Sequence, residues 1–95
     1  MLYIQFSHNY RRLFQELVNH NPSFLGKTTK VIEIFRKNPT DRRLGIHSLK
    51  RRLKGKWALS ITGDIRVVFV WINKHRVRFL AIGGHSQVYG RKLQS

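Results

Sequence analysis

The chain has 95 residues, which is enough for one small domain and too few for two separate hydrophobic cores. Nineteen lysine and arginine residues face only four acidic residues, so the net charge is +15 with histidine neutral. Such a surface attracts polyanions, chiefly nucleic acid, with anionic membranes and acidic proteins as the other candidates. The lack of cysteine excludes disulfides, thiolate metal sites and a cysteine nucleophile. We therefore expect one domain, residues 1–95, that contacts a polyanion.

The location expected from the sequence is the cytoplasm. No apolar run approaches the roughly 18 residues that a membrane-spanning helix needs. Residues 1–6 also lack the charged start and the long apolar core of a signal peptide.

The first half of the sequence predicts a strand and a helical hairpin. Residues 2–6 are short and aromatic, which is typical of a strand, and Ser7 or Asn9 can cap the helix that follows. Apolar residues then recur at helical spacing in two stripes, up to Asn21-Pro22 and again up to Asn38-Pro39. The members of these stripes are Tyr10, Leu13, Phe14, Leu17 and Val18, then Phe24 or Leu25, Thr28, Val31, Ile32 and Phe35.

The second half predicts an antiparallel sheet. Residues 41–56 are basic and turn-like, and three runs rich in Val, Ile, Phe and Trp follow at 56–61, 65–72 and 76–82. The connections at 62–64 and 73–75 are short enough for hairpin turns. The fold class expected is therefore α+β, with an antiparallel sheet of three to four strands packed on the two helices.

Folding both hairpins about their centres predicts the strand register. Ser60 then lies opposite Arg66, and Arg66 opposite Ile82, on the face that looks away from the helices. The apolar row expected against the helices consists of Trp57, Leu59, Val67, Phe69, Phe79 and Ala81. The same register brings the turn at Asp64 beside His85, so Asp64, Arg66 and His85 are expected at one end of the sheet.

A basic run leads into the sheet and predicts a phosphate-binding edge. The alternative is a solvated loop that is basic only because the whole chain is. The run contains His47, Lys50, Arg51, Arg52, Lys54 and Lys56.

Four further side chains are candidates for chemistry. His85 follows two glycines and can exchange protons near neutral pH, or it is a loop histidine without a role; His47 is a similar case. Arg66 interrupts an apolar strand, so it clamps a phosphate, pairs with Asp64 or reaches solvent at the edge of the sheet. Tyr89 can stack on a base. No two histidines have ligand spacing on one element, so no metal site is expected.

The second half also resembles a known family. The stretch Leu53-Lys54-Gly55-Lys56-Trp57-Ala58-Leu59-Ser60-Ile61-Thr62-Gly63-Asp64-Ile65-Arg66-Val67-Val68-Phe69 is similar to the central strands of the RelE/ParE toxin superfamily. The tail Ile82-Gly83-Gly84-His85-Ser86-Gln87-Val88-Tyr89 resembles the end of its YafQ-like branch. The match covers about residues 44–90, and the order strand, two helices, sheet is also that of the superfamily.

The resemblance implies a toxin that cuts mRNA on the ribosome, by attack of a ribose 2′-hydroxyl on the adjacent phosphorus, with no metal or other cofactor. It implies catalytic roles for His85, His47, Asp64, Arg66 and Tyr89. The RNA-contacting residues expected beside them are Lys50, Arg51, Arg52, Lys54, Lys56 and Ser60. Ser60 departs from the YafQ-like pattern, which has a further histidine at that position.

The implied partners are the ribosome, mRNA and a cognate antitoxin, which charge complementarity predicts to be acidic. Two alternatives remain open from the sequence. One is a ParE-like toxin that inhibits DNA gyrase and needs no histidine. The other is an RNA-binding or ribosome-associated module without catalysis, and an inactive toxin would resemble it.

Overall fold

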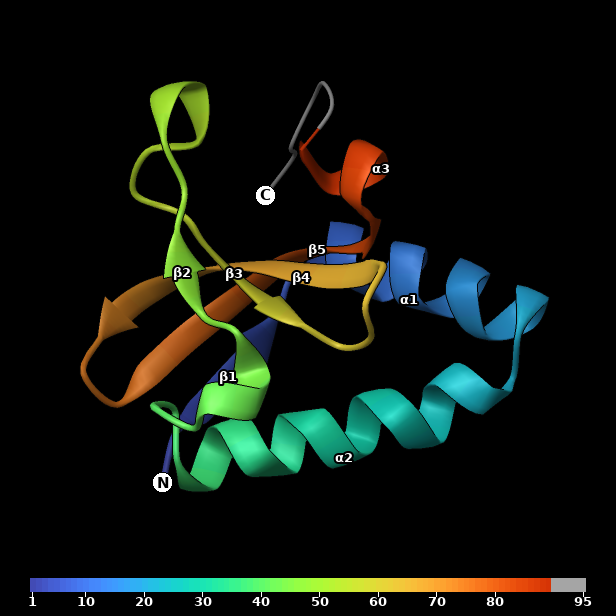
Figure 1. Ribbon diagram of the computed structural model, residues 1–95, viewed down its shortest axis with the longest axis horizontal. Helices are drawn as coiled ribbons and strands as arrows, with labels where there is room; N and C mark the ends of the chain where they lie inside the picture. The colour runs from blue at the N-terminus through green and yellow to red at the C-terminus, as the bar shows by residue number, and fades with distance from the viewer. Residues whose placement is uncertain (90–95) are drawn as a thin grey trace.

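A computed structural model describes residues 1–89 of the chain. The elements follow the order strand, two helices, four strands and a short final helix (Figure 1). Their bounds are β1 Tyr3–Phe6, α1 His8–His20, α2 Ser23–Lys37, β2 His47–Ser48, β3 Trp57–Ser60, β4 Ile65–Asn73, β5 Arg76–Gly84 and α3 His85–Tyr89. This order confirms the α+β class and adds two short elements, β2 and α3, that the sequence pattern does not reveal.

The helical hairpin begins and ends where the capping signals predict. The Ser7 hydroxyl oxygen accepts a hydrogen bond from the backbone N–H of Tyr10 at 3.0 Å, so Ser7 rather than Asn9 caps α1. α2 starts directly after Pro22, whose fixed φ suits the start of a helix. Both helices end at an asparagine, Asn21 or Asn38, whose backbone N–H still bonds to a carbonyl four residues back.

The sheet has five strands in the order β1-β5-β4-β3-β2, and β1 runs parallel to β5. All other pairs are antiparallel. The expectation of three to four antiparallel strands is therefore corrected to a mixed sheet of five. Without β1, the outer edge of β5 would expose a row of unpaired N–H and C=O groups. Two residues suffice for β2, which is too short to give a period-two pattern in the sequence.

The register is as predicted in the β3–β4 hairpin and in the middle of the β4–β5 hairpin, and it is shifted by one residue from Ile65 to Val68. Ser60 pairs with Arg66, and Trp57, Phe69 and Phe79 form a single row across three strands. Two register shifts, after Val68 and after Trp71, then interrupt the β4–β5 ladder. A bulge inserts one unpaired residue and reverses the side-chain alternation beyond it.

The first shift corrects two expectations. Arg66 lies opposite Gly83 rather than Ile82, and Ala81 pairs with Val68. Ala81 therefore belongs to a small apolar cluster on the far side of the sheet, and Ile82 takes its place in the main core. Nothing in the local sequence marks the extra residue, since the run 76–82 alternates equally well with or without it.

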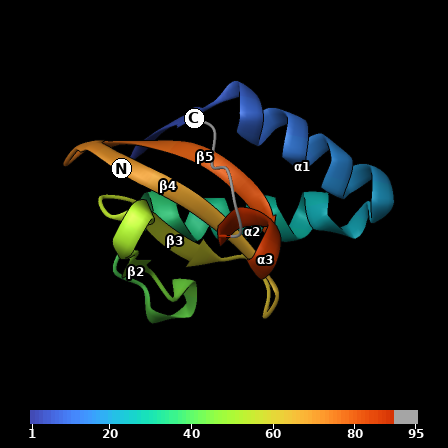
Figure 2. The ribbon, with the colours of Figure 1, turned by 90° about the horizontal axis from the view of Figure 1, so that it is seen from above.

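The main core lies between the sheet and the helices. Phe35 of α2 is fully buried against Phe69 and Phe79, with ring centroids 5.2 and 6.1 Å away. Trp57, a member of the expected apolar row, packs at its margin together with Trp71. α2 lies below the sheet in Figure 1 and α3 above it; Figure 2 shows α1 beyond the β1 and β5 side. We call the sheet face turned away from α2 the outward face.

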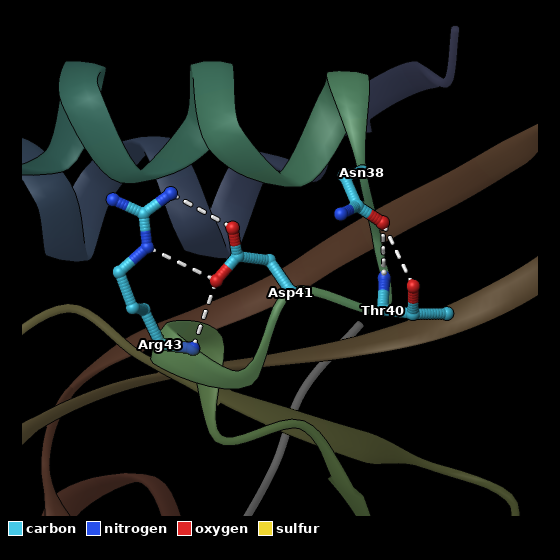
Figure 3. Close-up of polar contacts among 4 residues, drawn as sticks. All are labelled: Asn38, Thr40, Asp41 and Arg43. Atoms are coloured by element: carbon cyan, nitrogen blue, oxygen red, sulfur yellow. Dashed lines mark hydrogen bonds and ion pairs between the residues drawn. The ribbon is translucent and has the colours of Figure 1, made fainter.

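A tight polar loop joins α2 to the sheet (Figure 3). The side-chain oxygen of Asn38 accepts hydrogen bonds from the backbone N–H and the hydroxyl of Thr40. The carboxylate of Asp41 accepts three from Arg43, one from the backbone N–H and two from the guanidinium at 3.1 and 2.8 Å. These side-chain and backbone bonds lower the pKa of Asp41 to about 2. The loop then enters β2 through Gly45 in the left-handed conformation.

Between residues 1 and 89, no helix combines the length and the apolar character that crossing a bilayer requires.

Candidate functional site

The candidate site lies at the end of the sheet where β5 passes into α3. Ile65 pairs with Gly84, so the β3–β4 turn and the start of α3 are neighbours although about twenty residues separate them in sequence. A β-carbon added at Gly84 would lie 3.8 Å from a carboxylate oxygen of Asp64. The sheet therefore brings Asp64 and Arg66 to the same end as His85.

Arg66 is the half-buried cation of this site. One guanidinium N–H donates to the carbonyl oxygen of Thr62 at 2.9 Å across the turn. The hydroxyl of Thr62 in turn accepts from the backbone N–H groups of Asp64 and Ile65. The turn thus fixes the direction of the guanidinium, which also lies beside the Tyr89 hydroxyl and retains N–H groups that can donate to a ligand. An ion pair between Arg66 and Asp64, the other expectation for this arginine, is absent from the described residues.

His85 and Tyr89 occupy the first and last positions of α3. Their rings meet edge to face, with centroids 4.5 Å apart and planes at 87°. His85 is exposed and can exchange protons with a ligand or with water. The Tyr89 hydroxyl oxygen is buried and has no hydrogen-bond partner. Burial raises the pKa of this hydroxyl, and Arg66 opposes that rise through its positive charge and a polar contact too poorly aligned to count as a full hydrogen bond.

Helix α3 is held on the outward face from two directions. Val88 is buried in the small cluster with Val68, Leu80 and Ala81. The Arg52 guanidinium donates to the backbone carbonyl of Tyr89 at 2.8 Å. A cation at a helix C-terminus satisfies a carbonyl that the helix itself leaves unbonded. The basic run therefore also helps to hold α3, a contact that the sequence does not indicate.

His47 lies on the outward face but away from His85. It pairs with Ala58, which continues the cross-sheet row through Val68 to Ala81. Three strand spacings put the Cα atoms of His47 and Ala81 roughly 14 Å apart. One ring nitrogen of His47 lies 3.0 Å from the carbonyl oxygen of Gly45. His47 and His85 can therefore flank a nucleotide but do not contact each other.

The other predicted RNA-contacting residues surround this end of the outward face. Ser60 is half-buried beside Arg66, on the neighbouring strand. The segment from Lys50 to Lys54 rises on the same side of the sheet as α3 (Figure 1). Lys50, Arg51, Arg52 and Lys54 are exposed, and Lys56 is half-buried. Arg51 has a φ of 60°, a left-handed conformation that is uncommon outside glycine.

The charge balance around the site is strongly positive. Of the four acidic residues, Glu16 and Asp41 are already paired with Arg12 and Arg43. Glu33 is exposed on α2, and Asp64 is the carboxylate at the turn next to the start of α3. Across residues 1–89, no three His, Asp or Glu side chains gather closely enough to bind a metal ion.

Comparison with known proteins bears on the fold. No protein-family model matches the sequence, and no curated protein matches it significantly. Solved structures do match. A copper-bound mutant toxin from Helicobacter pylori has 25% identity and a TM-score of 0.73, over 93% of this chain and 99% of that one. YafQ from Escherichia coli has 16% identity and a TM-score of 0.77, over 95% and 100%.

A third match is the YoeB–YefM complex from Staphylococcus aureus, at 17% identity and a TM-score of 0.70, over 90% of this chain and 98% of that one. The chain has the fold of the RelE/ParE toxins. These matches span nearly the whole chain, whereas the sequence resemblance covers only its second half. The family fold predicted from residues 44–90 is confirmed, and it now includes the helical hairpin.

Within this RelE/ParE fold, three features of the site escape sequence reasoning. Thr62 directs Arg66, Arg52 holds α3, and α3 itself presents His85 and Tyr89 together. The signal available for α3 was the spacing of four between His85 and Tyr89, which matches one helical turn. Arg52 and Thr62 leave no such signal, because their roles depend on how the folded chain places their neighbours.

Proposed function

We propose that this chain is the toxin of a type II toxin–antitoxin pair and acts as an endoribonuclease on ribosome-bound mRNA. The observation that carries the proposal is the cluster of His85, Tyr89, Arg66 and Asp64 at one end of a cationic sheet face. A proton-exchanging group beside a fixed guanidinium suits attack at a phosphodiester. The structural relatives YafQ and YoeB, which were crystallised in toxin–antitoxin complexes, support the toxin role.

The proposed reaction needs no metal. A base takes the proton of a ribose 2′-hydroxyl, whose oxygen attacks the adjacent phosphorus. The bond to the 5′-oxygen breaks, that oxygen receives a proton from an acid, and a 2′,3′-cyclic phosphate remains. Arg66 stabilises the negative charge that develops on the phosphorane oxygens, because its guanidinium is already oriented by Thr62.

His85 is proposed to transfer one of these two protons, as acid or base. Asp64 orients His85 or the substrate, and Tyr89 positions a base or a phosphate. His47 lies on the same face across the sheet, so we propose that it acts on the far side of the bound nucleotide rather than through His85. Ser60 and the basic run from Lys50 to Lys56 bind phosphates, and an acidic antitoxin neutralises this face in the resting complex.

The test is primer extension on mRNA from a translating extract that contains the purified chain, with analysis of the new ends. We expect cuts that require ribosomes and leave a 2′,3′-cyclic phosphate. His85→Ala should slow cutting by about 10²–10⁴-fold, the usual contribution of general acid–base catalysis. His47→Ala should slow it less. His75→Ala is the matched control, because His75 is an exposed histidine in the β4–β5 turn.

The proposal is wrong if His85→Ala cuts at the wild-type rate. A gyrase supercoiling assay on the same protein separates the ParE-like alternative, which predicts inhibited supercoiling and intact mRNA. A non-catalytic binding module predicts salt-dependent RNA binding and neither effect.

A further inference from the structure

A cleft of about 500 Å³ opens at the β3 edge of the sheet, between α2 and the β3–β4 turn and next to the candidate site. Its walls come from one face of α2, from Arg43, from the turn and from Arg66. The lining residues are Lys30, Val31, Ile34, Arg43, Ser60, Ile61, Thr62, Gly63 and Arg66. The sequence assigned no role to Lys30 or Arg43, and the proposed reaction does not use either of them.

The cleft is cationic and has a partly apolar floor. Lys30, Arg43 and Arg66 contribute three positive charges, and its lining contains no carboxylate. The carboxylate of Asp41 binds Arg43 at the rim. Charges of one sign in a hollow reinforce each other's field and concentrate counterions of the opposite sign. Val31 and Ile34 offer apolar surface on which a ribose or the edge of a base can rest.

The cleft is continuous with the candidate site through Arg66 and Ser60. β2 pairs only with Trp57 and Ala58, so among residues 1–89 no strand covers the edge of β3 at Ser60. The backbone N–H of Ile61 bonds to Ile65 across the turn. Alternation along an antiparallel ladder then directs the N–H and C=O of Ser60 towards this edge, where Gly45 lies beside the Ser60 side chain. The backbone N–H and the hydroxyl of Ser60 thus add two hydrogen-bond donors to the three cations of the cleft.

We propose that this cleft holds the phosphodiester backbone of a single-stranded RNA on one side of the phosphate bound at Arg66. The assignment rests on the proposed function, because it extends the path of the same substrate strand. An RNA strand carries one negative charge per nucleotide. One of its phosphates binds Arg66 in the candidate site, and the next phosphates along the strand reach Lys30 or Arg43 in the cleft. An acidic peptide is the competing occupant, but it has no reason to continue across Arg66 to His85.

The test compares Lys30→Gln with Lys37→Gln. Both lysines are exposed and lie seven residues apart, two turns along the same face of α2, but only Lys30 lines the cleft. The probe is a fluorescent 12-nucleotide single-stranded RNA with 2′-O-methyl groups throughout, which cannot undergo 2′-hydroxyl attack. Its Kd is measured by anisotropy between 50 and 200 mM salt, and circular dichroism checks that each variant is folded.

We expect Lys30→Gln to reduce the slope of log K against log salt by about 0.7, the value for one lost phosphate contact on a single strand. Over a fourfold change in salt, that slope corresponds to a factor of about 2.6 in affinity. Lys37→Gln should leave the slope unchanged. Asp41→Asn should act in the opposite direction, because it releases Arg43 to the RNA while asparagine still caps the loop.

Equal slopes for Lys30→Gln and Lys37→Gln would overturn the proposal. It would also fail if Lys30→Gln weakened binding of a glutamate-rich 12-residue peptide and left RNA binding unchanged, which would assign the cleft to a protein partner. The cleavage assay distinguishes the two proposals. A wild-type chain that leaves ribosome-bound mRNA intact refutes the endoribonuclease, whereas the salt slopes alone decide the cleft.

Discussion

Replacing Tyr89 with phenylalanine should stabilise the fold. The hydroxyl oxygen of Tyr89 is buried and has no hydrogen-bond partner, although its ring packs well against His85 and the cluster around Val88. An unsatisfied buried polar group costs about 1–3 kcal/mol. The charge of Arg66 and its polar contact with the hydroxyl recover part of that cost. We therefore expect the free energy of unfolding to rise by about 1 kcal/mol in Tyr89→Phe.

Thermal unfolding followed by circular dichroism measures this effect. For a domain of this size, about 1 kcal/mol shifts Tm by roughly 4–8 °C. Tyr89→Ala is the control, because it removes the ring as well as the hydroxyl and should lower stability by about 2–3 kcal/mol. A Tm for Tyr89→Phe below the wild type would refute the reasoning, since it would mean that the hydroxyl has a stabilising partner.

The same variant connects stability to function. If the hydroxyl is kept buried and unpaired because RNA uses it, Tyr89→Phe should be more stable and cut more slowly. Such opposition between stability and activity is common where a site retains an unfavourable group. A variant that is more stable and cuts at the wild-type rate would limit Tyr89 to a packing role.

Three further predictions follow from single contacts. Arg66→Lys keeps the charge but loses the forked geometry and the bond to Thr62, so cleavage in the translating extract should fall about 10²-fold. Gly45→Ala should lower the free energy of unfolding in urea by about 1–2 kcal/mol, because φ is +57° and the new β-carbon would lie 3.3 Å from the Ser60 hydroxyl oxygen. Burial raises the pKa of Tyr10 well above its usual value of 10, so stability should be intact below pH 10 and fall above it by up to about 1.4 kcal/mol per pH unit. Tyr10→Phe should remove that alkaline loss when urea midpoints at about pH 9 and pH 11, on either side of the usual tyrosine pKa, are compared.

The helical hairpin shows how far local signals reach. Its limits follow from Ser7, Pro22 and the two asparagines, whose effects act within a few residues along the chain. The hairpin turn between β3 and β4 is equally local, and it predicts the pairing of Ser60 with Arg66. The bulge in β5 is different, because the choice of which residue to leave unpaired depends on how Phe79 and Ile82 pack against the helices.

In the candidate site too, some features follow from neighbouring residues and others depend on the tertiary structure. The sequence alone indicates the charge of the surface, the identity of the candidate residues and the end of the sheet at which Asp64, Arg66 and His85 gather. It does so because net charge, hydrophobic alternation and short turns are properties of neighbouring residues. It cannot place β1 beside β5, tie Arg52 to the end of α3 or show that His47 lies three strand spacings from β5. Those relations, like the cleft that brings Lys30 to the edge of the site, join segments far apart in the chain. Only the packed tertiary structure decides which of them meet.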